Sequence, residues 1–128
     1  MSAAPKPRPK YYDLNLAHLP APGLLSIFHR VSGALLFFPI LPGLLYILHL
    51  GLGSEDGYAR VVAFLGHPAV KLAFLGIVWL YAHHFFAGIR YLLLDLHIGI
   101  EKAPSRTSAM AVFVLGIVAT AAIGWWLW

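Results

Sequence analysis

The hydrophobic positions of this chain gather into three long runs, and most polar positions lie between these runs or near their ends. The pattern predicts helices over about 24–52, 67–97 and 107–128, each at or above the ~20 residues that a helix needs to cross a bilayer. Residues 1–23 form a short arm that is rich in proline. We therefore expect an all-α membrane protein with one three-helix transmembrane domain over residues 24–128.

Composition favours a membrane protein over a soluble helical one. Hydrophobic residues make up 60% of the chain and charged residues 11%, which is too little charge to cover a soluble domain of this size. The first run is much longer than the apolar core of a cleaved signal peptide, and the prolines of the arm exclude the amphipathic helix of a transit peptide. Because the chain has no cysteine, it offers no disulfide, thiolate metal site or iron–sulfur ligand of its own.

The positive charges predict an orientation. Three cations lie in the arm, and Lys102 and Arg106 lie between the second and third helices, whereas the stretch GLGSEDG at 51–57, between the first two helices, reads as a turn-rich loop with acidic residues. The positive-inside rule then places the N-terminus in the cytoplasm. Since the net charge of +4 is concentrated at membrane boundaries, we expect no nucleic-acid partner.

Polar residues interrupt the first helix near its cytoplasmic end. Ser26, His29, Arg30 and Gly33 follow i, i+3, i+4, i+7 spacing and share one helix face. An ionisable side chain inside a membrane costs roughly 2.5–3.5 kcal/mol on insertion scales, so it usually marks a functional site. Arg30 is also shallow enough to extend to the headgroups, but its neighbours on the same face favour a site.

A second polar cluster lies at the end of the second helix, in HHFFAGIRYLLLDLH at 83–97. Because the second helix runs antiparallel to the first, both clusters lie on the same side of the membrane. Arg90 and Asp95 are near the boundary, where they form either part of a site or a structural ion pair.

His83 and His84 lie well inside an apolar run. Four other histidines lie at or near helix ends: His18, His49, His67 and His97. A neutral imidazole at such depth suits an axial ligand of haem iron. Gly88, one turn from His84, leaves room for a flat macrocycle or for close helix packing. This favours His84 only modestly over His83.

The depths of the histidines predict a partner. His84 lies roughly 18 Å from the cytoplasmic end of its helix and His29 about 7–8 Å from the end of its own, so His29 is roughly 10 Å too shallow to face His84 across one iron. An opposing ligand must then come from another subunit. We expect the three helices to form part of a larger bundle, because three are few for burying so large a cofactor.

Two segments carry a resemblance to a known family. SIFHRVSG at 26–33 and HHFFAGIRYLLLD at 83–95 resemble the signature segments of the cytochrome b subunit of succinate dehydrogenase, complex II. That family reads approximately S-I-x-H-R-x-[ST]-G in its first helix and H-x-x-x-G-I-R-H-x-x-x-D in its second. The stretch RPKYYDLNLAHLPAPGLLSI at 8–27 is similar to the proline-rich segment that precedes the first helix in the family.

The resemblance implies a membrane anchor of a succinate:quinone oxidoreductase in the bacterial inner (cytoplasmic) membrane. Its expected partners are a flavoprotein subunit with FAD, an iron–sulfur subunit with its clusters, a second small membrane anchor subunit, membrane lipid and quinone. Haem b would be shared with the second anchor. Succinate oxidation would take place on other chains, so this chain would hold no catalytic residue for succinate.

The resemblance also assigns roles to individual residues. His84 matches the axial ligand of the haem iron, Ser26 and Arg30 match quinone-site residues, and His29 and Arg30 match residues against the haem propionates. Tyr91 stands where the family usually has histidine, so a propionate contact there is open. Three alternatives remain: a fumarate reductase anchor, a haem-free structural anchor, and, less favoured, an ion-conducting subunit, for which no acidic residue lies within the membrane.

Overall fold

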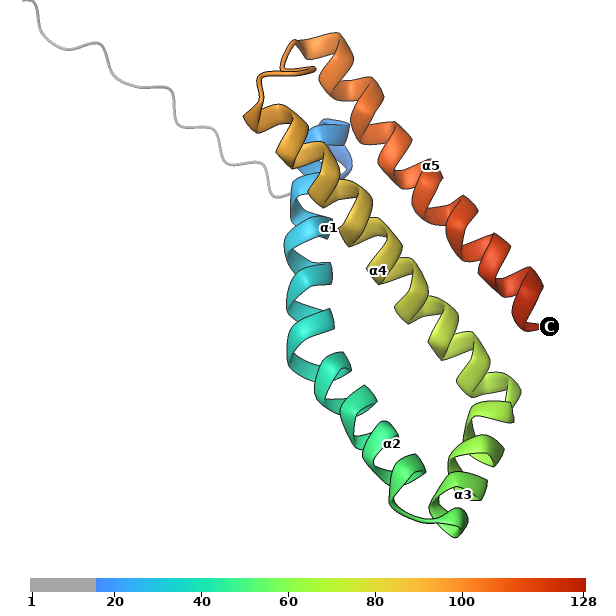
Figure 1. Cartoon of the computed structure of the whole chain (residues 1–128). Coiled ribbons are helices and arrows are strands. Elements are labelled where there is room, and N and C mark those ends of the chain that lie inside the picture. Colours follow the sequence, from blue (N-terminus) through green and yellow to red (C-terminus); the bar gives the residue numbers. More distant parts are fainter. Residues whose placement is uncertain (1–15) are drawn as a thin grey trace, which may run out of the picture.

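The computed structural model describes residues 16–128, which are almost entirely helical (Figure 1). Three helical segments are long and apolar enough to span a membrane: Ala21–Gly53, Pro68–Asp95 and Lys102–Leu127. The expected all-α class with three membrane-spanning helices is therefore confirmed. Most of the arm, including its cations Lys6, Arg8 and Lys10, lies outside the described residues.

The first span consists of three consecutive pieces: α1 (Ala21–Leu35), one turn of π-helix, η2 (Leu36–Ile40), and α2 (Leu41–Gly53). Pro22 lies in the first turn of α1, where its missing N–H costs nothing, so the helix begins three residues before the predicted position 24. Pro39 lies inside η2. Its ring cannot fit a regular α-helix, and the chain accommodates it by widening to a π-turn. Beyond this turn, α2 leans away from α4 and packs against α3 (Figure 1).

The predicted loop after the first span contains a helix, α3 (Glu55–Gly66). Ser54 caps it, because the Ser54 hydroxyl accepts a hydrogen bond from the Gly57 backbone N–H at 3.0 Å. Glu55 and Asp56 in the first turn suit the positive end of the helix dipole. Gly57 is buried against the Leu50 carbonyl of α2, which leaves no room for a side chain. The turn residues of this stretch therefore mark a helix start.

The second and third spans, α4 (Pro68–Asp95) and α5 (Lys102–Leu127), pack along each other. His67 caps α4 by accepting a hydrogen bond from the Ala69 backbone N–H at 3.2 Å. The chain leaves α4 through His97 and Gly99, which both have positive φ angles of 62° and 76°. A short 3-10 turn, η1 (Leu16–His18), precedes α1.

The buried core lies where α1, α4 and α5 meet, and it is made largely of small side chains. Its members are Leu25 of α1, Ala87 of α4, and Ala109 and Val112 of α5. Small residues let helix backbones approach closely in a membrane protein. The outer faces are apolar and exposed instead, as at Phe37, Phe38 and Tyr81. This distribution leaves broad surfaces for lipid or other membrane subunits.

Candidate functional site

His29 of α1 and His84 of α4 lie side by side in the structure. Their rings stack with centroids 4.3 Å apart and planes 17° from parallel. The sequence-based expectation that His29 is roughly 10 Å too shallow is therefore wrong. Counted from the observed helix ends, the two residues lie about 12 Å and about 17 Å along their helices. Neighbouring antiparallel helices need not end at the same level in the membrane. A distance counted from each helix end therefore does not give the relative depth of the two histidines.

The stacking leaves no room for a macrocycle between the two rings, so His29 lies beside His84 rather than opposite it. The expectation that an opposing iron ligand comes from a second subunit stays a prediction. This prediction now rests on the orientation of the His29 ring and no longer on the depth of His29 in the membrane.

The His29 ring also lies beside Gly88 and Tyr91 of α4, which follow His84 by four and seven residues. It lies 5.0 Å from the Tyr91 ring, centroid to centroid, and a Cβ placed on Gly88 would lie 4.0 Å from His29 Nε2. That distance is an ordinary van der Waals contact, so the His29 side chain does not require a glycine at position 88. The glycine that borders the His84 ring is Gly33 of α1, because a Cβ placed there would lie only 2.8 Å from His84 Cε1.

One nitrogen of His84 is occupied within the chain. His84 Nδ1 lies 3.1 Å from the His29 backbone carbonyl and 3.2 Å from the Ser32 hydroxyl oxygen. Metal-binding histidines commonly donate one ring N–H to a carbonyl, which leaves the other nitrogen for the metal. The arrangement matches this pattern, because the contacts of Nδ1 leave Nε2 as the nitrogen available to a metal.

The space in front of His84 also suits a large apolar cofactor. A groove of about 520 Å³ runs along the first span beside it, lined by Gly33, Leu36, Phe37, Ile40, Leu41, Leu44, Tyr81 and His84. An apolar wall that includes one histidine is an environment in which proteins hold haem. The residues present therefore fit the haem that the sequence predicts.

Ser26 and Arg30 form a pair on the exposed side of α1. Arg30 donates one hydrogen bond from Nη2 to the Ser26 hydroxyl oxygen at 3.0 Å and one from Nε to the Ser26 backbone carbonyl at 3.2 Å. Ser26 is half-buried, whereas Arg30 is exposed. The predicted sharing of one helix face by these two residues is thus visible in direct contacts.

Arg90 does not pair with Asp95 in the described part of the chain. It is 5% exposed and reaches α5, where it donates to the Ser108 hydroxyl at 2.9 Å and to the Ser105 hydroxyl and carbonyl at 2.9 and 3.1 Å. Asp95 is exposed. The ion-pair alternative is wrong because Arg90 lies on the face of α4 that packs against α5, so it ties these two helices together.

Tyr91 lies beside Arg90 and presents its ring to the guanidinium, whose Cζ is 5.6 Å from the ring centroid. Within residues 16–128 the buried Tyr91 hydroxyl has no hydrogen-bond partner. Through its ring contact with His29, Tyr91 therefore lies next to the His29–His84 pair.

His83, the second candidate for an iron ligand, is fully buried between helices. Its ring is surrounded by Trp79, Phe28 and Phe113, at centroid distances of 5.4, 5.9 and 5.2 Å. Both of its ring nitrogens lack a hydrogen-bond partner in the described residues. Because no atom of His83 reaches the groove or the outer surface, its surroundings are those of a packing residue.

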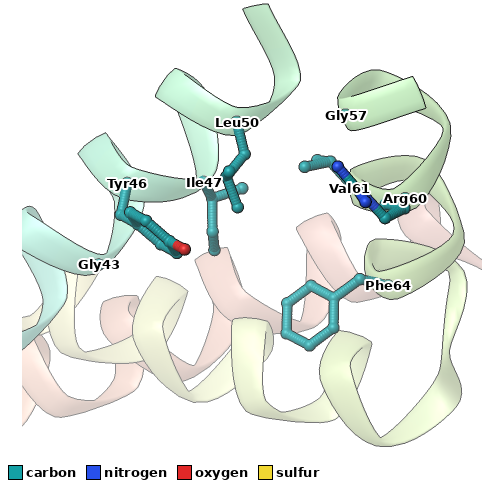
Figure 2. Close-up of a pocket in the computed structure, with 8 residues that line it drawn as sticks. All are labelled: Gly43, Tyr46, Ile47, Leu50, Gly57, Arg60, Val61 and Phe64. Carbon is teal, nitrogen blue, oxygen red and sulfur yellow. The ribbon is translucent and has the colours of Figure 1, made fainter. Parts of the chain in front are cut away.

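A separate cavity of about 440 Å³ lies between α2 and α3 (Figure 2). Tyr46, Ile47 and Leu50 of α2 face Val61 and Phe64 of α3 across it, and its lining is almost wholly apolar. Arg60 at this cavity is paired with Asp56 at 3.1 Å on the exposed side of α3. The cavity holds none of the predicted site residues.

The sequence assigned no role to Ser32 and Gly33, two residues of α1 that border His84. The sequence identified Gly33 only as a member of the helix face that it shares with Ser26, His29 and Arg30. Ser32 follows His29 by three residues, a spacing at which a serine hydroxyl can reach the carbonyl of the preceding turn. That local signal was readable, but the contact of the Ser32 hydroxyl with His84 depends on the packing of α4.

Comparison with known proteins finds similarity over most of the chain. Residues 4–123 match the family model described as succinate dehydrogenase/fumarate reductase transmembrane subunit. The chain is also 36% identical over 122 residues to the succinate dehydrogenase cytochrome b556 subunit of Coxiella burnetii, an alignment that covers 94% of this chain and 97% of that relative.

Proposed function

Because the chain belongs to the succinate dehydrogenase/fumarate reductase transmembrane subunit family, we propose that it is the cytochrome b anchor subunit of a succinate:quinone oxidoreductase. It is a multi-pass membrane protein and a subunit of an enzyme complex. In our proposal it lies in a bacterial inner membrane with its N-terminus in the cytoplasm. There it holds the flavoprotein and iron–sulfur subunits, while succinate oxidation takes place on those partners.

The observation that carries the haem part of the proposal is the environment of His84. Its Nδ1 is held by the His29 carbonyl, and the side chain borders an apolar groove of about 520 Å³. Haem b bound there would supply one-electron transfer. The chain would contribute the His84 imidazole as one axial ligand, and a second anchor subunit would contribute the other.

His29 and Arg30 would bind the acidic edge of the cofactor. Arg30 is exposed and directly follows His29 on α1, and a guanidinium forms strong charge-assisted hydrogen bonds with carboxylates. His29 lies against His84 and is therefore next to any group that His84 binds. Tyr91 can donate a hydrogen bond near the same place but carries no positive charge.

Ser26 and Arg30 would bind the quinone that accepts the electrons. Since the Ser26 hydroxyl oxygen accepts a hydrogen bond from Arg30, the hydroxyl proton remains free to donate to a quinone carbonyl. The remaining N–H groups of Arg30 would stabilise the negative charge that develops on that oxygen during reduction. The two residues are thus arranged to act on one carbonyl.

Substitution at this pair tests the quinone role. In the purified complex, Arg30→Leu should lower the rate of quinone reduction by about 10- to 150-fold, because a hydrogen bond to a charged group contributes about 1.5–3 kcal/mol. Ser26→Ala should lower it by about two- to tenfold, as expected for a neutral hydrogen bond. Succinate oxidation measured with a soluble dye should be largely unchanged in both variants.

Arg60→Leu provides a matched control, because Arg60 is an exposed arginine on α3 that pairs only with Asp56 among the described residues. It should leave both activities unchanged. Equal loss of quinone and dye activity in Arg30→Leu would instead indicate an assembly defect and would contradict the quinone role.

A further inference from the structure

Ser32 is a fully buried polar side chain that contacts the predicted iron ligand. It is 1% exposed and lies on the side of α1 that faces α4. Its hydroxyl donates a hydrogen bond to the His29 carbonyl at 3.0 Å, and its oxygen lies 3.2 Å from His84 Nδ1. The hydroxyl therefore contacts both members of the histidine pair.

The contacts of His84 Nδ1 determine which of its ring nitrogens carries the proton. The His29 carbonyl oxygen, 3.1 Å from Nδ1, can only accept a hydrogen bond. When the Ser32 hydroxyl donates to the same carbonyl, its oxygen can still accept a hydrogen bond from Nδ1 at 3.2 Å. A hydrogen bond from Nδ1 to this carbonyl requires the tautomer with the proton on Nδ1, which leaves the lone pair on Nε2.

We propose that Ser32 is a positioning residue that fixes the ring orientation of His84 and tunes its strength as an iron ligand. This inference rests on the proposed function, in which His84 binds haem b. Acceptors on Nδ1–H increase the electron density of the imidazole and make it a stronger ligand. A more electron-rich axial ligand favours ferric over ferrous iron, so the Ser32 oxygen lowers the reduction potential of the haem.

The geometry separates this role from simple helix packing. A serine in a helix often donates to the carbonyl of its own preceding turn, and that bond alone would leave α4 unaffected. Here the same oxygen also reaches across to α4. The neighbouring Gly33 lets the His84 ring approach α1 closely enough for this contact, because a side chain there would meet Cε1.

Removal of the hydroxyl tests the inference. In the purified complex, Ser32→Ala should raise the midpoint potential of the b-type haem, measured by optical redox titration. We expect the ratio of ferric to ferrous haem at a fixed potential to fall by about three- to tenfold, a tenfold change being 59 mV for one electron. The low-spin ferric EPR signal should shift as well, whereas haem content should stay within about twofold of the wild type.

Two further variants separate the hydroxyl from the shape of the side chain. Ser32→Thr keeps the hydroxyl and should retain the wild-type potential. Ser32→Cys has a similar shape but a much weaker acceptor, so it should raise the potential as Ser32→Ala does, and it replaces that variant if the alanine protein does not assemble. An unchanged potential in Ala and Cys, or equal shifts in Thr and Ala, would overturn the role of the hydroxyl.

The same titration distinguishes this inference from the proposed function. If the wild-type complex contains b-type haem that is lost in His84→Leu, but the potential does not respond at Ser32, only the present inference fails. If the haem spectrum persists unchanged in His84→Leu, both fail, because His84 is then not the ligand.

Discussion

Replacing His84 by leucine is expected to abolish or strongly change the low-spin b-type absorption spectrum of the purified complex. The substitution removes the imidazole that borders the groove and leaves an apolar side chain of similar size, which suits a membrane-spanning helix. Loss of the His29 carbonyl contact to Nδ1 should cost far less than an iron ligand. The reduced-minus-oxidised spectrum, normalised to the amount of assembled complex, provides the measurement.

His83→Leu is the matched control, since it makes the same change at the preceding position of α4. Within the described residues the His83 nitrogens make no hydrogen bond, so leucine removes no polar interaction there. The spectrum should remain that of the wild type. A spectrum lost in His83→Leu and kept in His84→Leu would reverse the assignment, and a wild-type complex without haem would support a purely structural anchor.

A single methyl group on Gly33 should be nearly as damaging. In Gly33→Ala the new Cβ would lie 2.8 Å from His84 Cε1 and 3.3 Å from Nδ1, closer than packed atoms tolerate. The imidazole must then rotate away from α1 or the two helices must separate, and either movement breaks the bond to the His29 carbonyl. Because disturbing the support of a metal ligand typically costs 10- to 100-fold in affinity, the haem bound per assembled complex should fall by at least about tenfold at limiting haem.

Gly88→Ala is the control for this prediction. Gly88 also lies beside the His29–His84 pair, but a Cβ placed on it would come no closer than 4.0 Å to its neighbour, His29 Nε2. That distance is an ordinary contact, so haem content should be close to that of the wild type. Equal haem content in the two alanine variants would indicate that the His84 ring does not depend on its fit against α1.

Much of the polar cluster could be predicted from helical spacing alone. Ser26 and Arg30 are four residues apart, and this local relation brings them into hydrogen-bond contact. Similarly, His84, Gly88 and Tyr91 are separated by four and three residues and therefore share one face of α4, and His29 lies against this face. Local periodicity was sufficient because these relations lie within one helix.

Relations between helices were predicted less well. Depths counted from the helix ends predicted that His29 and His84 lie at different levels in the membrane, whereas their rings stack on each other in the structure. Arg90 was considered as a partner of Asp95, five residues away on the same helix, but it binds Ser105 and Ser108 of α5. In both cases the partner lies on another helix, at a position set by helix stagger and rotation.

Hydropathy and residue spacing by themselves determined that three helices span a membrane and which polar residues share a face, because both properties follow from the helix repeat and the cost of burying charge. The two signature segments also determined the family. Only the tertiary structure decided that Gly33 and Ser32 border His84 and that His83 is enclosed by aromatic rings. Those contacts depend on how closely α1, α4 and α5 approach, and side-chain packing across helices sets that distance.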